Sequence, residues 1–124
     1  MKKIVSLSLI IGTLVLASAS DADVEALAVA KCGECHLMGE ITKEKLSNMK
    51  APPYWAIAKK AREKYEKEED KIKYIVDYAF SPTEDKMLFP KETKEKFGVM
   101  PSLKGKVTQE EIRQISTYIL EKKF

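Results

Sequence analysis

The chain has 124 residues, of which 22 are Lys or Arg and 19 are Asp or Glu, for a formal net charge of +3. This length allows one domain with a modest core and is too short for two. The charge is too small to create the strong basic field that holds nucleic acid or a membrane surface, so we expect no nucleic-acid partner.

Residues 1–19 predict a secretory signal peptide. Lys2 and Lys3 precede an apolar stretch from Ile4 to Leu16, and Ala17-Ser18-Ala19 follows as a small-residue cleavage site. A retained membrane anchor is the alternative, but the stretch from Ile4 to Ala19 falls short of the roughly 20 residues that span a bilayer. We therefore expect no membrane insertion after cleavage, export to the periplasm, and a mature domain of residues 20–124.

The first helix of the mature chain leads directly into its most informative motif. Asp21 or Asp23 is expected to cap this helix. One face carries three apolar residues, Val24, Leu27 and Ala28. The helix runs toward Lys31-Cys32-Gly33-Glu34-Cys35-His36. Two cysteines separated by two residues and followed at once by a histidine form the attachment signature of a c-type haem.

The spacing of this motif has a physical reason. The thiols of Cys32 and Cys35 each add across one vinyl group of the porphyrin to form a thioether, and two intervening residues match the separation of the vinyls. His36 then lies where a neutral ring nitrogen can bind the iron from the proximal side. We therefore expect one covalently attached haem c, bound by Cys32, Cys35 and His36, with His36 as a metal ligand.

A redox dithiol and a zinc site are the alternatives for a cysteine pair of this spacing. A dithiol enzyme favours a strand before the pair, in a βαβ context, whereas residues 23–30 predict a helix. A tetrahedral zinc site needs four ligands, and the chain has only two cysteines and one histidine. Both alternatives are therefore weaker than haem attachment.

A loop with the breakers Gly39 and Ala51-Pro52-Pro53 is expected after the motif. The next helix is predicted from Tyr54 to about Glu66, with these residues toward the core: Trp55, Ile57, Ala58 and Ala61. A third helix is expected to begin near Asp70 and to end at Ser81-Pro82. Its apolar stripe has helical spacing and comprises Ile72, Ile75, Val76 and Ala79.

Two further helices complete the predicted chain. A short one runs from Lys91 to Phe97 and ends at Gly98. The last is the clearest, because Thr108 and Glu111 form a capping box. Its buried side is predicted to comprise Ile112, Ile115 and Ile119, with Tyr118 beside them.

His36 is the only histidine in the chain, which excludes a second histidine ligand and any Ser/His or Cys/His nucleophile arrangement. The sixth ligand of the iron is then a methionine or, less often, a lysine. Met100 has the best setting, because Gly98 permits close backbone approach and Pro101 keeps the loop out of a helix. Met87 is the runner-up. The other methionines of the mature chain, Met38 and Met49, are expected to fill the core.

Cys32 to His36, Pro52-Pro53, Met100-Pro101 and the terminal helix with Tyr118-Ile119 together resemble the ordered landmarks of the small monohaem class I cytochrome c domain. The resemblance implies an all-α cytochrome c fold, with four to five helices and long loops around one covalently bound haem. The first and last helices would cross near that haem. It also implies that His36 donates its second ring proton to the carbonyl of Pro52 or Pro53.

The chain departs from the family at one position. The family often has an aromatic residue four positions before the first cysteine, and this chain has Ala28 there. We therefore expect the terminal helices to pack differently at their crossing.

With His36 and Met100 on the two axial positions, no site remains for substrate. We therefore expect no enzyme but a periplasmic one-electron carrier, in which the soft thioether raises the reduction potential. Its partners are expected to be redox proteins that dock transiently through a small interface, and the chain is expected to be a monomer. The alternatives are a haem enzyme or sensor with a displaceable sixth ligand, and a haem subunit of a larger redox complex.

Overall fold

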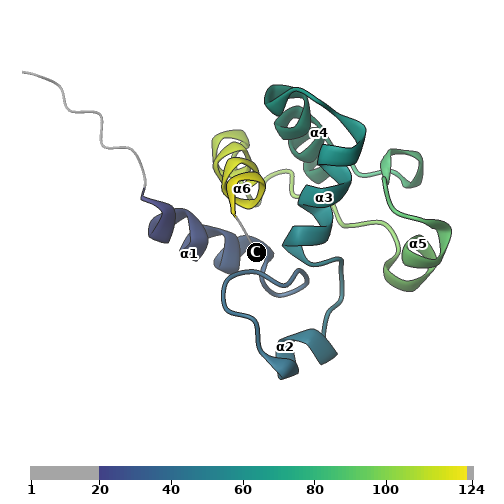
Figure 1. The fold of residues 1–124 in the computed structure, drawn as a ribbon, viewed down its shortest axis with the longest axis horizontal. Coiled ribbons are helices and arrows are strands. Elements are labelled where there is room, and N and C mark those ends of the chain that lie inside the picture. Colours follow the sequence, from purple (N-terminus) through teal and green to yellow (C-terminus); the bar gives the residue numbers. More distant parts are fainter. Residues whose placement is uncertain (1–19, 123–124) are drawn as a thin grey trace, which may run out of the picture.

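The computed structural model describes residues 20–122, so the predicted signal peptide lies outside the described residues. Within this range the chain forms six α-helices, one 3-10 helix and no strand, which confirms the all-helical class (Figure 1). The elements are α1 (Asp21–Cys32), α2 (Lys43–Ser47), α3 (Tyr54–Lys64), α4 (Glu68–Phe80), η1 (Glu84–Lys86), α5 (Lys91–Phe97) and α6 (Gln109–Glu121). No helix among them is long and apolar enough to cross a membrane.

The C-terminal helix α6 is the centre of the fold. It packs against α1 on one side and against α3 and α4 on the other, as Figure 1 shows. The predicted buried side of α6 is confirmed, because Ile112, Ile115 and Ile119 are each at most 3% exposed. Complete burial of such side chains contributes about 1.5–3 kcal/mol each. This helix therefore organises the core that supports the rest of the molecule.

The other predicted helix faces also meet the core. In α4 the buried residues are Ile72, Val76 and Ala79. In α3 they are Tyr54, Ala58 and Ala61, while Trp55 and Ile57 are partly buried against the same core. In α1 they are Val24 and Ala28. Ala28 is fully buried, so a small side chain occupies the position where an aromatic one would need more room.

The cap of α1 differs from the prediction. The hydroxyl of Ser20, and neither Asp21 nor Asp23, accepts the hydrogen bond from the N3 backbone N–H. Asp23 is that N3 residue, and its carboxylate accepts the Ser20 N–H in return, which completes a capping box. The capping box predicted for α6 is confirmed, with Thr108 and Glu111 bonded reciprocally.

The loops contain more helix than the sequence predicts. The segment between the cysteine motif and Pro52 includes α2, because Thr42 caps it by accepting the N–H of Lys45 at 3.2 Å. The segment after α4 includes η1. Neither α2, η1 nor α5 contains a buried residue. The four longer helices therefore make the core, and the short ones are parts of the loops.

Candidate functional site

The cysteine motif folds as one tight turn that continues from the end of α1. The N–H of His36 donates to the carbonyl of Cys32 at 2.9 Å, and the N–H of Cys35 donates to the same carbonyl at 3.3 Å. Between the two cysteines, a Cβ on Gly33 would overlap the carbonyl oxygen of Val29, so glycine is required there for close packing. The two cysteines and the histidine therefore belong to one short hydrogen-bonded turn.

The two thiols are free and differ in environment. Cys32 is partly buried against the core cluster, and Cys35 is exposed. Burial, and to a smaller extent the neighbouring Cys35, raises the pKa of Cys32 to about 11. A thiol with this pKa is protonated at neutral pH, whereas dithiol enzymes depend on a lowered pKa that supplies the reactive thiolate. The environment of Cys32 is therefore unlike that of a redox dithiol.

The imidazole of His36 is held by one strong hydrogen bond. Its Nδ1 lies 2.6 Å from the carbonyl oxygen of Pro52. Because a carbonyl oxygen only accepts, Nδ1 carries the proton and donates it. The predicted bond from this histidine to a proline carbonyl is confirmed, and Pro52 rather than Pro53 provides the oxygen.

This bond and the burial of the ring together determine the state of His36. Burial lowers the pKa of the imidazole, and the Pro52 carbonyl opposes that shift only in part. The ring is therefore neutral at neutral pH, with its proton on Nδ1 and its lone pair on Nε2. A lone pair on a neutral, oriented imidazole is the arrangement that metal-binding histidines have in proteins.

The loop that carries Pro52 is closed by backbone hydrogen bonds from both of its ends. The N–H of Lys50 donates to the Cys35 carbonyl at 3.2 Å, and the N–H of Tyr54 donates to the Leu37 carbonyl at 3.2 Å. These bonds flank Pro52 and return the chain to the cysteine turn. The orientation of the imidazole therefore depends on the whole loop from the motif to α3.

Met100 is the first candidate sulfur ligand, and its surroundings match those that the sequence predicts. It is partly buried and packs against the same core cluster as Cys32. Gly98 ends α5 and has a φ of 71°, a left-handed conformation that glycine adopts without strain. The structure thereby confirms that α5 ends at Gly98 and that an irregular segment carries Met100.

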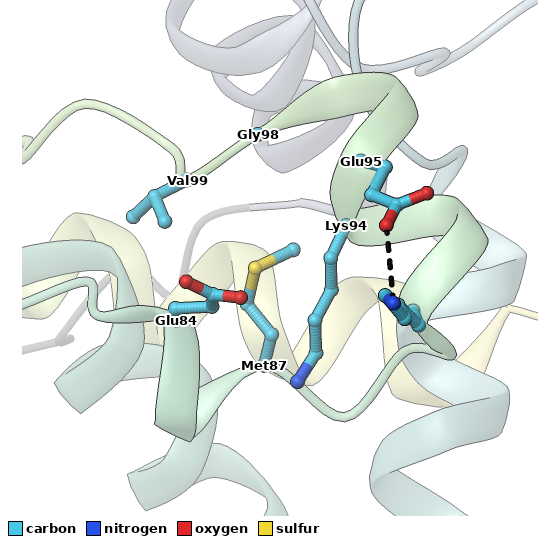
Figure 2. Close-up of a pocket in the computed structure, with 7 residues that line it drawn as sticks. Glu84, Met87, Lys94, Glu95, Gly98 and Val99 are labelled. Atoms are coloured by element: carbon cyan, nitrogen blue, oxygen red, sulfur yellow. Dashed lines mark ion pairs between the residues drawn. The ribbon is translucent and has the colours of Figure 1, made fainter.

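Met87, the runner-up, lies elsewhere. It is buried but is not part of the core cluster that Cys32 and Met100 border. Its side chain lines a cavity of about 170 Å³ between η1 and α5, together with Gly98 and Val99 (Figure 2). Met87 therefore lines this cavity, whereas Met100 packs against the core cluster. Met38 is buried in the core cluster, as expected, whereas Met49 is only partly buried and is not part of that cluster.

The residues that hold the Met100 loop were not found from the sequence. Burial raises the pKa of Tyr78, and the neighbouring backbone of Met100 opposes that shift. Ser102 bonds to the end of α4, at the carbonyl of Phe80. The sequence offers one signal for Tyr78. It lies four residues after Tyr74 on the same helix, and this spacing places both tyrosines on one face.

The candidates for holding a haem group are Cys32, Cys35 and His36 in the turn after α1, and Met100, which borders the same core cluster as Cys32. Over residues 20–122 no group of three or more His, Cys, Asp or Glu side chains is arranged to bind a metal ion. Comparison of the chain with protein-family models, with curated proteins and with solved structures finds no match.

Proposed function

We propose that this protein is a periplasmic one-electron carrier of the class I cytochrome c type. In this proposal residues 1–19 are removed on export, and residues 20–124 form the domain around one haem c. Cys32 and Cys35 tether the group, and His36 and Met100 bind its iron. Bound haem supplies a one-electron couple between ferric and ferrous iron.

The observation that carries this proposal is the hydrogen bond between His36 Nδ1 and the Pro52 carbonyl. Because Nδ1 carries the proton, the lone pair of the neutral ring is on Nε2. This histidine directly follows a pair of cysteines in the same turn. A dithiol site does not need an oriented neutral imidazole, and the two cysteines and one histidine of the chain are too few for a tetrahedral zinc site, which needs four ligands. The donor set of two thiols, one imidazole and one thioether fits covalently attached haem with His/Met ligation.

The surroundings of these residues suit electron transfer. Cys35 is exposed, so the tether lies where a partner protein can approach. Pro52 holds the imidazole in one orientation, and the core cluster packs against Cys32 and Met100. Because these contacts keep the ligands in place, little reorganisation accompanies a change in the charge of the iron. Transient redox partners and a monomeric chain fit this role.

The test is to produce the full chain in a host that matures c-type cytochromes and to replace Met100 by alanine. The wild-type protein should gain the mass of one haem, lose both free thiols and show the ferric sulfur-to-iron absorption band. Met100→Ala should remove that band, permit carbon monoxide binding and lower the potential by on the order of 0.1 V, within the roughly 0.8 V range that axial ligands span.

Met87→Ala is the matched control, because it removes the other candidate thioether. This variant should keep the sulfur-to-iron band and the potential of the wild type. A band that survives Met100→Ala and disappears in Met87→Ala would transfer the sixth ligand to Met87. Colourless, iron-free wild-type protein from a host that matures another c-type cytochrome in parallel would overturn the proposal.

A further inference from the structure

The C-terminal end of α4 holds the chain that follows Met100. The last carbonyls of a helix have no partner inside it, and they must bond elsewhere. Here the Ala79 carbonyl accepts the N–H of Leu103 at 2.9 Å, and the Phe80 carbonyl accepts the hydroxyl of Ser102 at 2.7 Å. The segment after Met100 therefore closes the end of α4.

The hydroxyl of Ser102 makes a second bond. It accepts the N–H of Lys104 at 3.2 Å while it donates to Phe80. One side chain thus joins the helix end to the turn that follows Pro101. Ser102 is two residues from Met100, which is close enough for this anchor to limit where the thioether can go.

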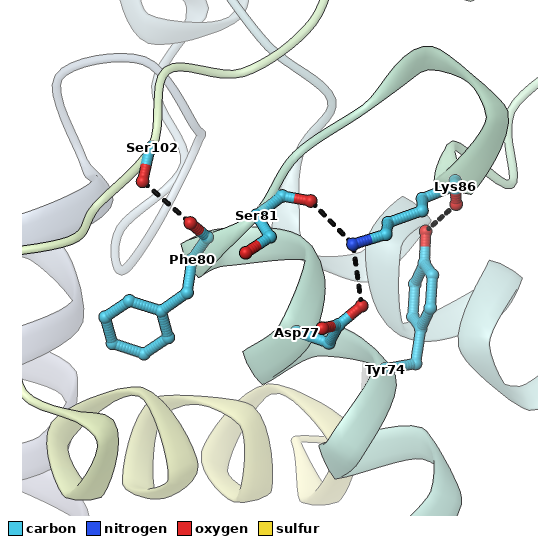
Figure 3. Close-up of polar contacts among 6 residues, drawn as sticks. All are labelled: Tyr74, Asp77, Phe80, Ser81, Lys86 and Ser102. Carbon is cyan, nitrogen blue, oxygen red and sulfur yellow. Dashed lines mark hydrogen bonds and ion pairs between the residues drawn. The ribbon is translucent and has the colours of Figure 1, made fainter.

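The segment that precedes α5 is also bound to α4 and to Ser81 just after it. The hydroxyl of Tyr74 donates to the Lys86 carbonyl at 2.8 Å. The ammonium of Lys86 donates to the Ser81 carbonyl at 2.8 Å and pairs with the Asp77 carboxylate at 3.1 Å. Figure 3 shows these contacts beside the one between Ser102 and Phe80. Residues on both sides of α5 are therefore bound to α4.

We propose that Ser102 is a positioning residue for Met100. Its two hydrogen bonds anchor the loop to the end of α4 and thereby increase the fraction of molecules in which the thioether faces the iron. This inference rests on the proposed function. Ser102 lies two residues after Met100 in the sequence, so in this proposal it acts through the backbone that joins the two residues.

The test measures how readily an external ligand displaces the thioether. Ferric holoprotein is titrated with imidazole, and binding is followed by the loss of the sulfur-to-iron band. Ser102→Ala should bind imidazole about two- to fivefold more tightly, because the exposed hydrogen bonds it removes contribute roughly 0.5–1 kcal/mol net. Ser102→Thr keeps the hydroxyl and should bind imidazole with the wild-type affinity.

Two further variants separate positioning from general loosening of the fold. Thr117→Ala removes a hydroxyl that bonds to the Arg113 carbonyl within α6, and it should leave the imidazole affinity unchanged. In a Met100→Ala background no thioether is left to displace, so adding Ser102→Ala should leave the imidazole affinity unchanged. Because this background lacks the sulfur-to-iron band, imidazole binding is followed there by the change in the main haem absorption band. The amide of Leu103 should exchange its hydrogen faster in Ser102→Ala than in the wild type.

The outcomes distinguish this inference from the proposed function. Wild-type protein that contains haem but no sulfur-to-iron band would overturn His/Met ligation and the inference with it. A wild type with the band, and a Ser102→Ala variant with wild-type imidazole affinity, would overturn the positioning role alone. An equal affinity change in the Met100→Ala background would also overturn it, because the effect would not pass through the thioether.

Discussion

At the scale of single residues, His36 shows how a neighbour determines the chemistry of a side chain. An isolated imidazole near neutral pH exists in two tautomers and is partly protonated. The Pro52 carbonyl selects the tautomer with the proton on Nδ1, and burial favours the neutral ring. The lone pair of Nε2 is therefore available before any metal binds.

A second polar contact joins the first and last helices, α1 and α6. The hydroxyl of Tyr118 donates to the Glu25 carboxylate at 2.5 Å, and the ammonium of Lys122 donates to the Tyr118 hydroxyl at 2.8 Å. Glu25 belongs to α1 and Tyr118 to α6, so this contact reinforces the packing of those helices. The Tyr118 bond is the main cause of a lowered pKa at Glu25, with Lys122 adding to it.

Tyr118→Phe should remove most of the shift at Glu25. A lowered carboxylate pKa adds stability above its unfolded value of about 4.5, and that stability is lost as the pH falls through the folded pKa. In the variant the Glu25 pKa should rise, and the free energy of unfolding at pH 7 should fall by about 1 kcal/mol or less, because the pair is partly exposed. NMR titration and urea unfolding measure the two effects.

Tyr65→Phe is the control for this variant, since no hydrogen bond of the Tyr65 hydroxyl is found among residues 20–122. It should leave both the Glu25 pKa and the acid dependence of stability unchanged. An unchanged Glu25 pKa in Tyr118→Phe would show that Lys122 alone causes the shift.

At the scale of helices, two N-caps of the same kind begin helices that differ greatly in how much they bury. Thr108 and Thr42 cap α6 and α2 by the same bond, from the N3 backbone N–H to the threonine hydroxyl oxygen. The helix α6 buries five residues, whereas α2 buries none. The same chemical change at the two caps therefore has different consequences for the whole fold.

Thr108→Ala should lower the free energy of unfolding by about 1 kcal/mol, the usual effect of losing an N-cap. Thr42→Ala should lower it by only about a few tenths of a kcal/mol, because α2 can fray without opening the core. Urea unfolding of the two variants, with unchanged slopes, measures both values. Equal losses would mean that α2 is as tightly coupled to the core as α6.

At the scale of the whole molecule, the four longer helices and the loops differ in what they bury. The helices α1, α3, α4 and α6 supply most of the buried residues. The two connecting segments, 33–53 and 81–108, contain the short helices, which bury none. These segments also carry His36, Pro52 and Met100. A haem held by these residues, as proposed, would add apolar surface for both segments to pack against.

Under the proposed function, removal of the haem should loosen these two segments more than the core. Protein made without haem, for example as Cys32→Ala/Cys35→Ala, should show faster amide hydrogen exchange in residues 43–47 and 91–97 than the holoprotein. Residues 109–121 should keep more of their protection. Its thermal midpoint should also fall, because a ligand that binds only the folded state stabilises it. Equal amide exchange rates of residues 43–47 and 91–97 in the two forms would contradict this prediction.

Local patterns made much of the fold predictable. The helical periods of α4 and α6 correctly placed Ile72, Val76, Ile112 and Ile119 in the core, because apolar residues at that spacing share one face of a helix. The capping box of α6 was also predictable, since its partners are three residues apart. The cap of α1 was predicted wrongly, because Ser20, Asp21 and Asp23 are all residue types that cap helices and only the backbone geometry selects Ser20.

The sequence by itself determined the cysteine turn and its histidine, since covalent spacing places groups within five residues of one another whatever the fold. The tertiary structure decided that Pro52 rather than Pro53 bonds to His36, and that Ser102 binds the end of α4. These contacts join residues 16 and 22 positions apart. At such separations only the packing of the helices determines which groups meet, so no local pattern could indicate them.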